Sequence, residues 1–324
     1  MGRVSVLSEG EEIIKQNLPV IFIHNGKQGY LKDTVRLAQK YNENVILLGD
    51  ASNAHICRNW VNTSKLSNSK FDIFKKSYIH LSPNSYQYEL FCFQRYFLLE
   101  AYMELGEIEE CVMLDSDVCT FVNYSTMGFQ QYDVAASCMY YHDDTKWMAV
   151  PHVTYWKIEQ LRDFTNYLIE QYRDDSKKLT DKYETLLRDK ASYGISDMSL
   201  LYLWITGKER KFWNLAIAQN GRTFDVFLNT SVNCDGIPFQ MTHGIKRIVF
   251  HDKIPYFITE DNVEIRANVI HAQGDRKKYI HMIASEHYTV LGLYCSEVIF
   301  KIQKTIERGK RFIGRYIGNG RRMK

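Results

Sequence analysis

The sequence predicts a doubly wound α/β fold. Two apolar runs, Leu18–Ile23 and Val45–Leu48, have the composition of buried parallel strands, and the segment from about Tyr30 to Tyr41 between them is expected to be helical. Strands that alternate with helices in this way form an open sheet with helices on its faces. The length of 324 residues and the hydrophobic fraction of 45% allow one such domain with a substantial core.

The expected sheet indicates where a ligand would lie. Doubly wound sheets bind ligands at the carboxyl ends of their strands. Polar residues follow the first two strands, so we expect a nucleotide near His24, Asn25 and Asp50. Asn-Gly and Gly-Asp are equally ordinary turn sequences, so a structural role for these residues stays open. The sequence has no Gly-x-Gly-x-x-Gly or Walker motif, which argues against dinucleotide binding and ATP hydrolysis.

Two carboxylates stand one residue apart about a third of the way along the chain. Asp115 and Asp117 directly follow the apolar run Cys111–Leu114, which is predicted to be a buried strand. Carboxylate oxygens at a strand end can hold Mg²⁺ or Mn²⁺, and these ions usually combine one or two carboxylates with phosphate oxygens. Asp also favours turns and helix caps, so a single Asp-x-Asp is by itself more often structural.

A second polar segment follows the predicted strand Val269–Ile270. His271 can act as a neutral imidazole ligand of a divalent metal, Gly274 lets the backbone approach a phosphate, and Lys277 supplies a mobile cation. This segment therefore offers the partners that the Asp-x-Asp needs to form a site for a metal and a diphosphate.

With an Asp-x-Asp at a strand end and a later His-x-x-Gly-x-x-Lys, the chain resembles the metal-dependent GT-A glycosyltransferases, particularly those of family eight. The resemblance implies a Rossmann-like GT-A domain with a mixed sheet, and retention of anomeric configuration. It also implies that Mn²⁺ or Mg²⁺ is held by Asp115, Asp117 and His271. The positions assigned to the donor, a nucleotide-sugar expected to be UDP-linked, are Ser116, Gly274 and Lys277.

A buried helix is expected before the Asp-x-Asp strand. It should cover Tyr88–Leu105, with its N-cap among Asn84–Gln87, and Arg95 interrupts its apolar surface. Resembling enzymes carry an Arg on this helix, facing the donor sugar or the diphosphate, which implies a catalytic role for Arg95. Alternatively, its side chain reaches the surface or pairs with Glu89 or Glu100.

A further candidate lies at the start of another predicted helix. The apolar run over 200–205 follows Tyr193–Met198, so Ser196 or Asp197 should stand at the helix start, where an ordinary N-cap would explain either residue. Similar enzymes place a functional Asp at this point, which binds a sugar in retaining enzymes or acts as the base in inverting ones. Asp197 is therefore the leading catalytic candidate outside the metal centre.

The region before that helix suggests an acceptor pocket. Tyr140–Asp144 and Trp147 combine aromatic rings with hydrogen-bonding groups, which suits a sugar, and similar enzymes begin to shape the acceptor site here. Chance clustering explains the pattern about as well, because the chain has 22 Tyr. The mixed charges of Arg173–Lys190 indicate only a solvent-exposed helix.

The C-terminal segment is strongly basic. Residues 301–324 hold nine Lys or Arg and one acidic residue, a net charge of +8. Apolar residues interleave with these cations, as in a helix that lies on an anionic membrane surface. A solvated terminus and a tail that attracts nucleic acid are the alternatives, although nucleic acid is not the partner we expect. We therefore expect a catalytic domain over residues 1–285 and a basic amphipathic helical tail over 286–324.

Cysteine usage and hydropathy indicate the compartment. The seven cysteines are scattered without Cys-x-x-Cys spacing, which favours reduced thiols and excludes a zinc ribbon. The sequence has no run of eighteen apolar residues, and its start lacks the pattern of a signal peptide. We expect a cytoplasmic protein that is peripheral to a membrane where its tail binds lipid.

The sequence thus predicts an enzyme that moves a hexose from a nucleotide-diphosphate sugar to a hydroxyl of a glycan or glycolipid. A non-catalytic nucleotide-sugar or glycan-binding module of the same fold is the first alternative, although binding alone needs no complete metal and diphosphate set. A nucleotidyltransferase is the second alternative. The late His-x-x-Gly-x-x-Lys segment favours glycosyl transfer over it.

Overall fold

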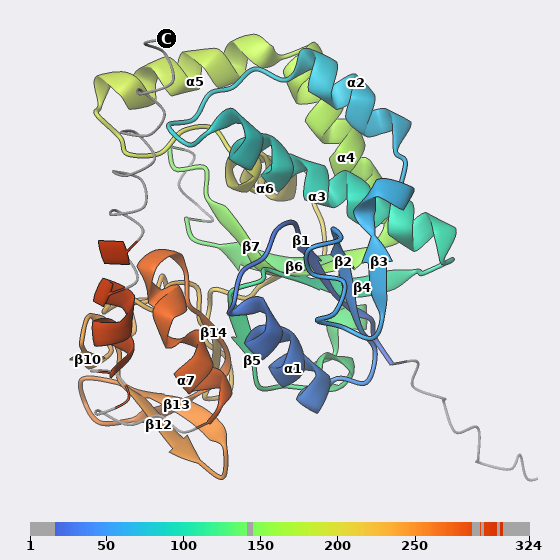
Figure 1. Cartoon of the computed structure of the whole chain (residues 1–324). Coiled ribbons are helices and arrows are strands. Elements are labelled where there is room, and N and C mark those ends of the chain that lie inside the picture. Colours follow the sequence, from blue (N-terminus) through green and yellow to red (C-terminus); the bar gives the residue numbers. More distant parts are fainter. Residues whose placement is uncertain (1–16, 141–144, 287–291, 293–294, 303–304, 307–324) are drawn as a thin grey trace, which may run out of the picture.

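A mixed β-sheet forms the centre of the molecule. The computed structural model describes residues 17–140, 145–286, 292, 295–302 and 305–306 (Figure 1). In spatial order the sheet contains β3 (Trp60–Asn62), β2 (Val45–Gly49), β1 (Val20–His24), β4 (Glu110–Leu114), β7 (Ala149–Lys157), β6 (Val134–Cys138) and β8 (Phe212–Asn214). The first four strands in this order are parallel, whereas β7 is antiparallel to both of its neighbours. The predicted α/β class with a mixed sheet is confirmed.

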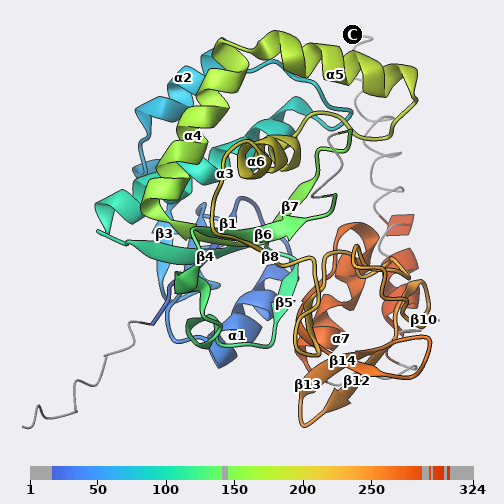
Figure 2. The ribbon, with the colours of Figure 1, turned by 180° about the vertical axis from the view of Figure 1, so that it is seen from behind.

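Helices cover both faces of this sheet, as the doubly wound prediction requires. One face carries α1 (Leu31–Tyr41), whose buried residues pack against the sheet. Figures 1 and 2 show the other helices on the opposite face, with α5 as the outermost of them. They are α2 (Ser69–Ser77), α3 (Tyr86–Leu105), α4 (Ile158–Arg173), α5 (Ser176–Arg188) and α6 (Asp197–Thr206).

A smaller sheet lies beside the first one (Figure 2). Its strands are β12 (Ile248–His251), β13 (Ile254–Ile258), β14 (Glu264–His271), β5 (Val118–Thr120) and β9 (Arg222–Phe224). The same part of the chain holds a hairpin of β10 (Met241–Thr242) and β11 (Ile245–Lys246) and the short helix α7 (Ile280–Ala284). The chain turns away after β9 ends at Phe224, and the Asp225 carboxylate contacts Lys246.

The chain passes from the large sheet to the small one through the Asp-x-Asp. β4 ends at Leu114 and β5 begins at Val118, so residues 115–117 form the connection. In the small sheet β5 pairs antiparallel with β14, and His271 lies opposite Val118. The backbone N–H of Ala272 then donates to the carbonyl of Asp117 at 3.0 Å. This register brings together two segments that are more than 150 residues apart in the sequence.

Helix α3 and the start of α6 meet above the strand ends. The hydroxyl of Ser85 accepts from the backbone N–H of Tyr88 and caps α3, so the helix begins slightly earlier than predicted. Gly194 packs against the loop before α3, and a Cβ on it would lie 2.2 Å from the Leu81 carbonyl oxygen. Only glycine permits this close approach, which places the start of α6 beside α3.

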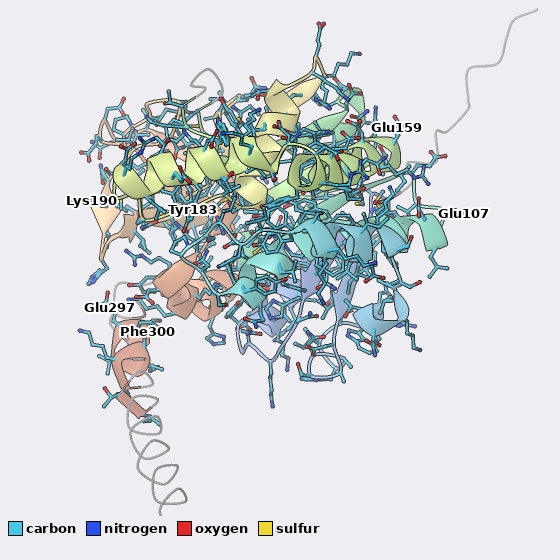
Figure 3. The ribbon with its side chains drawn as sticks, turned by 90° about the horizontal axis from the view of Figure 1, so that it is seen from above. Glu107, Glu159, Tyr183, Lys190, Glu297 and Phe300 are labelled. Atoms are coloured by element: carbon cyan, nitrogen blue, oxygen red, sulfur yellow. The ribbon has the colours of Figure 1, made fainter. Side chains whose placement is uncertain are left out.

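The C-terminal segment is described in part. Residues 295–302 and 305–306 are helical. Figure 3 shows Glu297 and Phe300 on this segment, at a distance from α5, which carries Tyr183. Among residues 301–324, for which a basic tail is predicted, 303–304 and 307–324 lie outside the described residues. Within the described part, no helix is both long and apolar enough to cross a membrane.

Candidate active site

A cleft of about 360 Å³ contains most of the residues that the sequence singles out. Its walls come from α3, from residues 192–199 around the start of α6, and from residues 271–277 at the end of β14 and just after it. The cleft therefore forms where the helical layer, the large sheet and the small sheet meet. The predicted residues that line it are Arg95, Asp115, Asp117, Asp197, His271, Gly274 and Lys277.

Three potential metal ligands converge in this cleft. The ligand atoms of Asp115, Asp117 and His271 all lie within 4.8 Å of one another. A cation bound to two carboxylates and an imidazole lies roughly 2.0–2.2 Å from each ligand atom, so this spacing fits one ion. The predicted set is thus brought together by strand register.

The imidazole of His271 is held in the orientation that a metal ligand needs. Its Nδ1 lies 2.7 Å from the carbonyl of Val226, which can only accept, so Nδ1 carries a proton. Its Nε2 then faces Asp117, 3.4 Å from Oδ1. Burial opposes the charged imidazole, but Asp117 outweighs it and raises the pKa of His271. A cation between these two side chains would take the place of that proton.

Lys277 completes the other side of the Asp117 carboxylate. Its Nζ lies 3.1 Å from Asp117 Oδ2 and 5.4 Å from the centre of the Tyr30 ring. Burial alone would raise the pKa of Asp117, but His271 and Lys277 lower it well below its usual range. Gly274, which begins the 3₁₀ helix Gly274–Tyr279, has a φ of +58°, a backbone conformation that favours glycine.

Arg95 joins two carboxylates across the cleft. Its guanidinium donates to Asp115 and, at 3.1 Å, to Asp197 Oδ2. The alternatives of a surface position or a pair with Glu89 or Glu100 are wrong, because the side chain is only 11% exposed and Glu100 pairs with Lys70. Arg95 therefore connects Asp115, one of the three potential metal ligands, to the start of α6.

Asp197 lies inside the cleft and does not cap its helix. Ser196 is the N-cap and forms a capping box with Ser199, so the Asp197 carboxylate is available for other contacts. It is 3% exposed and accepts from Arg95 and the hydroxyl of Tyr96. Burial is the main reason that the pKa of Asp197 is raised, and Arg95 opposes that shift.

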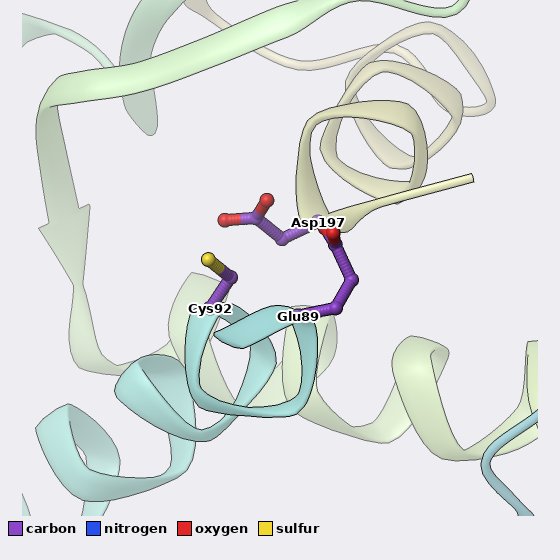
Figure 4. A group of neighbouring side chains, drawn as sticks. All are labelled: Glu89, Cys92 and Asp197. Atoms are coloured by element: carbon purple, nitrogen blue, oxygen red, sulfur yellow. The ribbon is translucent and has the colours of Figure 1, made fainter. Parts of the chain in front are cut away.

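Two further side chains of α3 belong to this wall, and their role was not evident from the sequence. Figure 4 shows Glu89 and Cys92 of α3 pointing toward Asp197. Glu89 is buried and accepts from Ser82 and Asn84 at 2.8 and 2.9 Å. The spacing of three residues from Glu89 to Cys92 and on to Arg95 places them on one helix face, and this was the signal available in the sequence.

His152 is a second residue that the sequence did not single out. It lies on β7, is fully buried, and stacks on His271 with ring centres 4.8 Å apart and planes 11° apart. Burial is the main cause that keeps the pKa of His152 well below its ordinary value, so the ring is neutral. A flat neutral surface against His271 restricts how that ring can turn. The sequence gives no signal for this contact, because it depends on the position of β14.

The residues predicted near the nucleotide lie outside the cleft lining. Asp50 accepts from the backbone N–H of Gly26 at 2.7 Å and closes the loop after β1, which agrees with a turn role. His24 packs edge-on against Tyr30 at 6.4 Å, and Asn25 is exposed. The carbonyl of Ser116 accepts from Thr34 and fixes the Asp-x-Asp to α1.

Only part of the predicted acceptor region is described. Trp147 lines the cleft and Tyr140 is exposed, and an acceptor role for them stays a prediction. Residues 141–144, which include the predicted contacts His142 and Asp143, lie outside the described residues.

A buried ion pair lies next to the potential metal ligand His271. Lys246 Nζ lies 2.5 Å from Asp225 Oδ1 and 2.8 Å from the carbonyl of Phe227, and both charged side chains are at most 1% exposed. The other oxygen of Asp225 accepts from the backbone N–H of His271 at 3.1 Å. Asp225 thus contacts the backbone of His271, and the carbonyl of Val226 contacts its ring. Lys246 fixes this segment by binding Asp225 and Phe227.

This arrangement predicts that Lys246→Met destabilises the protein strongly. The substitution leaves the Asp225 carboxylate buried without its cation, which costs about 3–5 kcal/mol of unfolding free energy. Lys177→Met is the matched control, because Lys177 pairs with Asp181 at the surface with its side chain 84% exposed, so its loss should leave the unfolding free energy nearly unchanged. Urea unfolding measures both values. Equal losses in the two variants would contradict a structural role of the buried pair.

Comparisons with known proteins give similarity to solved glycosyltransferases at low identity. No protein-family model matches the sequence, and the curated proteins give no significant match either. Mouse xyloside xylosyltransferase 1, in its apo form, is 12% identical, with 59% of this chain and 82% of that chain covered and a TM-score of 0.42. A glycosyltransferase involved in glycosylation of the major capsid of PBCV-1 is 10% identical, with 52% and 74% covered and a TM-score of 0.29. The apo bifunctional glycosyltransferase WbbM is 11% identical, with 63% and 39% covered and a TM-score of 0.35.

Proposed function

We propose that the protein is a metal-dependent glycosyltransferase of the GT-A type that moves a hexose from a nucleotide-diphosphate sugar to a hydroxyl of a glycan or glycolipid. The observation that carries this proposal is the convergence of Asp115, Asp117 and His271 in one cleft, with Lys277 on the same carboxylate. Two carboxylates, an imidazole and a lysine in this arrangement match a metal and a diphosphate together.

The bound ion would be Mn²⁺ or Mg²⁺, and it would supply a Lewis acid that neutralises charge on the departing diphosphate. Lys277 faces the same side of the cleft and can bind phosphate oxygens through its ammonium group. Arg95 holds the Asp115 carboxylate in place and presents a second cation to the donor. These residues would lower the energy of the leaving group as its negative charge develops.

The base and ribose of a UDP-linked donor would extend from Lys277 toward Tyr30. Lys277 lies over the Tyr30 ring, and His24 packs on that ring from the end of β1. Burial is the main cause of the lowered pKa of His24, so a neutral imidazole faces the region beside Tyr30. Asn25 and Asp50 shape the adjoining loop.

The acceptor would enter from the side of Trp147 and Asp197. Asp197 is already bound by Arg95, Tyr96 and the N–H of Met198, which suits a carboxylate that orients sugar hydroxyls more than one that takes up a proton. We therefore favour retention of configuration, with inversion expected if Asp197 acts as the base. Following the anomeric proton of the product by NMR distinguishes these outcomes.

Asp117→Asn should remove the metal site and leave the fold intact. The change replaces one of three ligands by a weaker neutral one of the same shape, so Mn²⁺ binding should weaken by at least about 100-fold. Electron paramagnetic resonance of free Mn²⁺ measures the Mn²⁺ affinity and does not depend on enzymatic activity. Asp181→Asn on the exposed side of α5 is the control. Unchanged Mn²⁺ affinity would remove Asp117 from the metal site.

The same variant serves in the test of the reaction. With Mn²⁺ present, the wild type should release nucleotide from at least one sugar in a panel linked to UDP, GDP or dTDP, and a chelator should stop the release. Asp117→Asn should reduce it to the background rate. Tight metal and donor binding without turnover, across the panel and with added oligosaccharide acceptors, would instead support a non-catalytic binding module.

Arg95→Lys tests the link between the two carboxylates. Lysine keeps the positive charge but lacks the planar fork that reaches Asp115 and Asp197 at once. The loss of a charged hydrogen bond should lower kcat/KM by about 10- to 100-fold. Arg162→Lys is the control, because Arg162 pairs with Glu104 at the surface with its side chain 47% exposed. Equal kinetics in both variants would rule out the bridging role of Arg95.

We also propose that the C-terminal segment binds an anionic membrane surface. Ile299, Ile302 and Ile306 lie at helical spacing and are each more than 50% exposed, and basic residues follow them in the sequence. Replacing all three by Ser should weaken sedimentation with phosphatidylglycerol vesicles, as should deletion of residues 301–324. Leu105→Ser and Leu187→Ser, which change exposed leucines elsewhere, are the controls. Binding that is equal in the full chain and the deletion variant would contradict this proposal.

A further inference from the structure

A second cavity, of about 400 Å³, lies apart from the catalytic cleft, and none of its lining residues lines that cleft. Its walls come from η2 (Tyr124–Thr126), η3 (Phe129–Gln131), β8, β9 and β14. Two of its aromatic residues, Trp213 and Phe224, pack into the core cluster shared with α1, on the face of the large sheet opposite α3 and α6. The cavity is within the size range of ligand pockets, about 300–1,000 Å³.

One buried polar group in this cavity has no partner among the described residues. Asn268 is 1% exposed, lines the cavity, and its Oδ1 accepts no hydrogen bond there. The register between β14 and β9 shifts between Ala267 and Val269, so Asn268 stands at a β-bulge. Bulges redirect side chains and are frequent next to binding sites. A buried amide oxygen without a donor is unfavourable unless a ligand or an ordered water supplies one.

The walls around Asn268 combine flat apolar surface with polar groups. Trp213 and Tyr132 are half-buried and stack with ring centres 5.3 Å apart, which gives a rigid aromatic wall. Gln219 and Arg222 exchange backbone hydrogen bonds of 2.9 Å across a two-residue turn at Asn220 and Gly221, both with positive φ. The polar rim is therefore carried by a fixed turn.

This combination selects the class of ligand. Among the described residues that line the cavity, Arg222 is the only charged one, so a phosphate group or a highly charged ligand would lack the cations it needs. Amide groups that donate and accept, beside aromatic faces, suit neutral hydroxyl groups on a ring with apolar C–H faces. We propose that this cavity is a second saccharide-binding site, which takes a neutral oligosaccharide outside the catalytic cleft.

The site stands on its own geometry and does not require the proposed transferase activity. If both proposals hold, the cavity would retain a glycan whose other end is presented to a cleft on the same or another molecule. Such a second contact raises the effective concentration of the chain end at the cleft.

The test uses the full chain without metal or nucleotide. The wild type is applied to an array of neutral and acidic oligosaccharides built on glucose, galactose, mannose, xylose and N-acetylglucosamine, and the strongest binder is titrated by calorimetry. We expect a neutral glycan to bind. Asn268→Ala and Arg222→Ala should each weaken its binding by about tenfold.

Control variants distinguish binding in this cavity from binding in the catalytic cleft and from a loss of folding. Asp117→Asn in the catalytic cleft and Arg188→Ala on α5 should leave glycan binding unchanged. Asn268→Ala should keep or raise the melting temperature, because the lost oxygen has no partner among the described residues, whereas a structural asparagine would lower it. Arg222 is exposed, so its variant reports on binding without a change in folding.

Three results would overturn the proposal. The first is that no neutral glycan binds the wild type. The second is that Asn268→Ala and Arg222→Ala bind the glycan with unchanged affinity. The third is that Asp117→Asn no longer binds it. Because no metal or donor is present, glycan binding is observed whether or not the protein transfers sugar. Failure of this proposal and failure of the proposed activity are thus distinguishable.

Discussion

The antiparallel pairing of β5 with β14 is the constraint on which the site depends. It places His271 opposite Val118 and therefore beside Asp117, although the two segments are far apart in the chain. A shift of this register by one residue would turn the His271 side chain to the other face of the small sheet. The position of the potential metal centre is thus set by the backbone hydrogen bonds between β5 and β14, which also hold the small sheet together.

The same pairing explains the buried polar groups below the cleft. Asp225 and Lys246 lie in the interior, where an isolated charge is costly, and they are tolerated because each has a charged partner and further hydrogen bonds. Asp225 accepts from the backbone N–H of His271, and Lys246 donates to the carbonyl of Phe227. Between these two residues, the carbonyl of Val226 accepts from the ring of His271. The buried ion pair is therefore linked to the orientation of the His271 side chain.

Much of the architecture was predictable because it is local. Apolar runs identify β1, β2 and β4, and the capping signals at Ser85 and Ser196 locate α3 and α6 within a few residues. Glu89 and His152 were not found, because their roles depend on which helix face or strand meets the cleft. Asp50 shows the converse case, since a polar residue after a strand can serve the turn itself.

The charge of the cleft gives a further reason to expect a cation there. Among its described lining residues, four carboxylates, on Glu89, Asp115, Asp117 and Asp197, face two permanent cations, Arg95 and Lys277. Burial reduces this imbalance at Asp197 by raising its pKa, and hydrogen bonds from Ser82 and Asn84 spread the charge of Glu89. Neither effect would let a diphosphate approach Asp115 and Asp117, because like charges repel strongly in a partly buried site. A divalent cation at these two residues would reverse the local charge, so binding of an anionic donor should require prior or simultaneous binding of the metal.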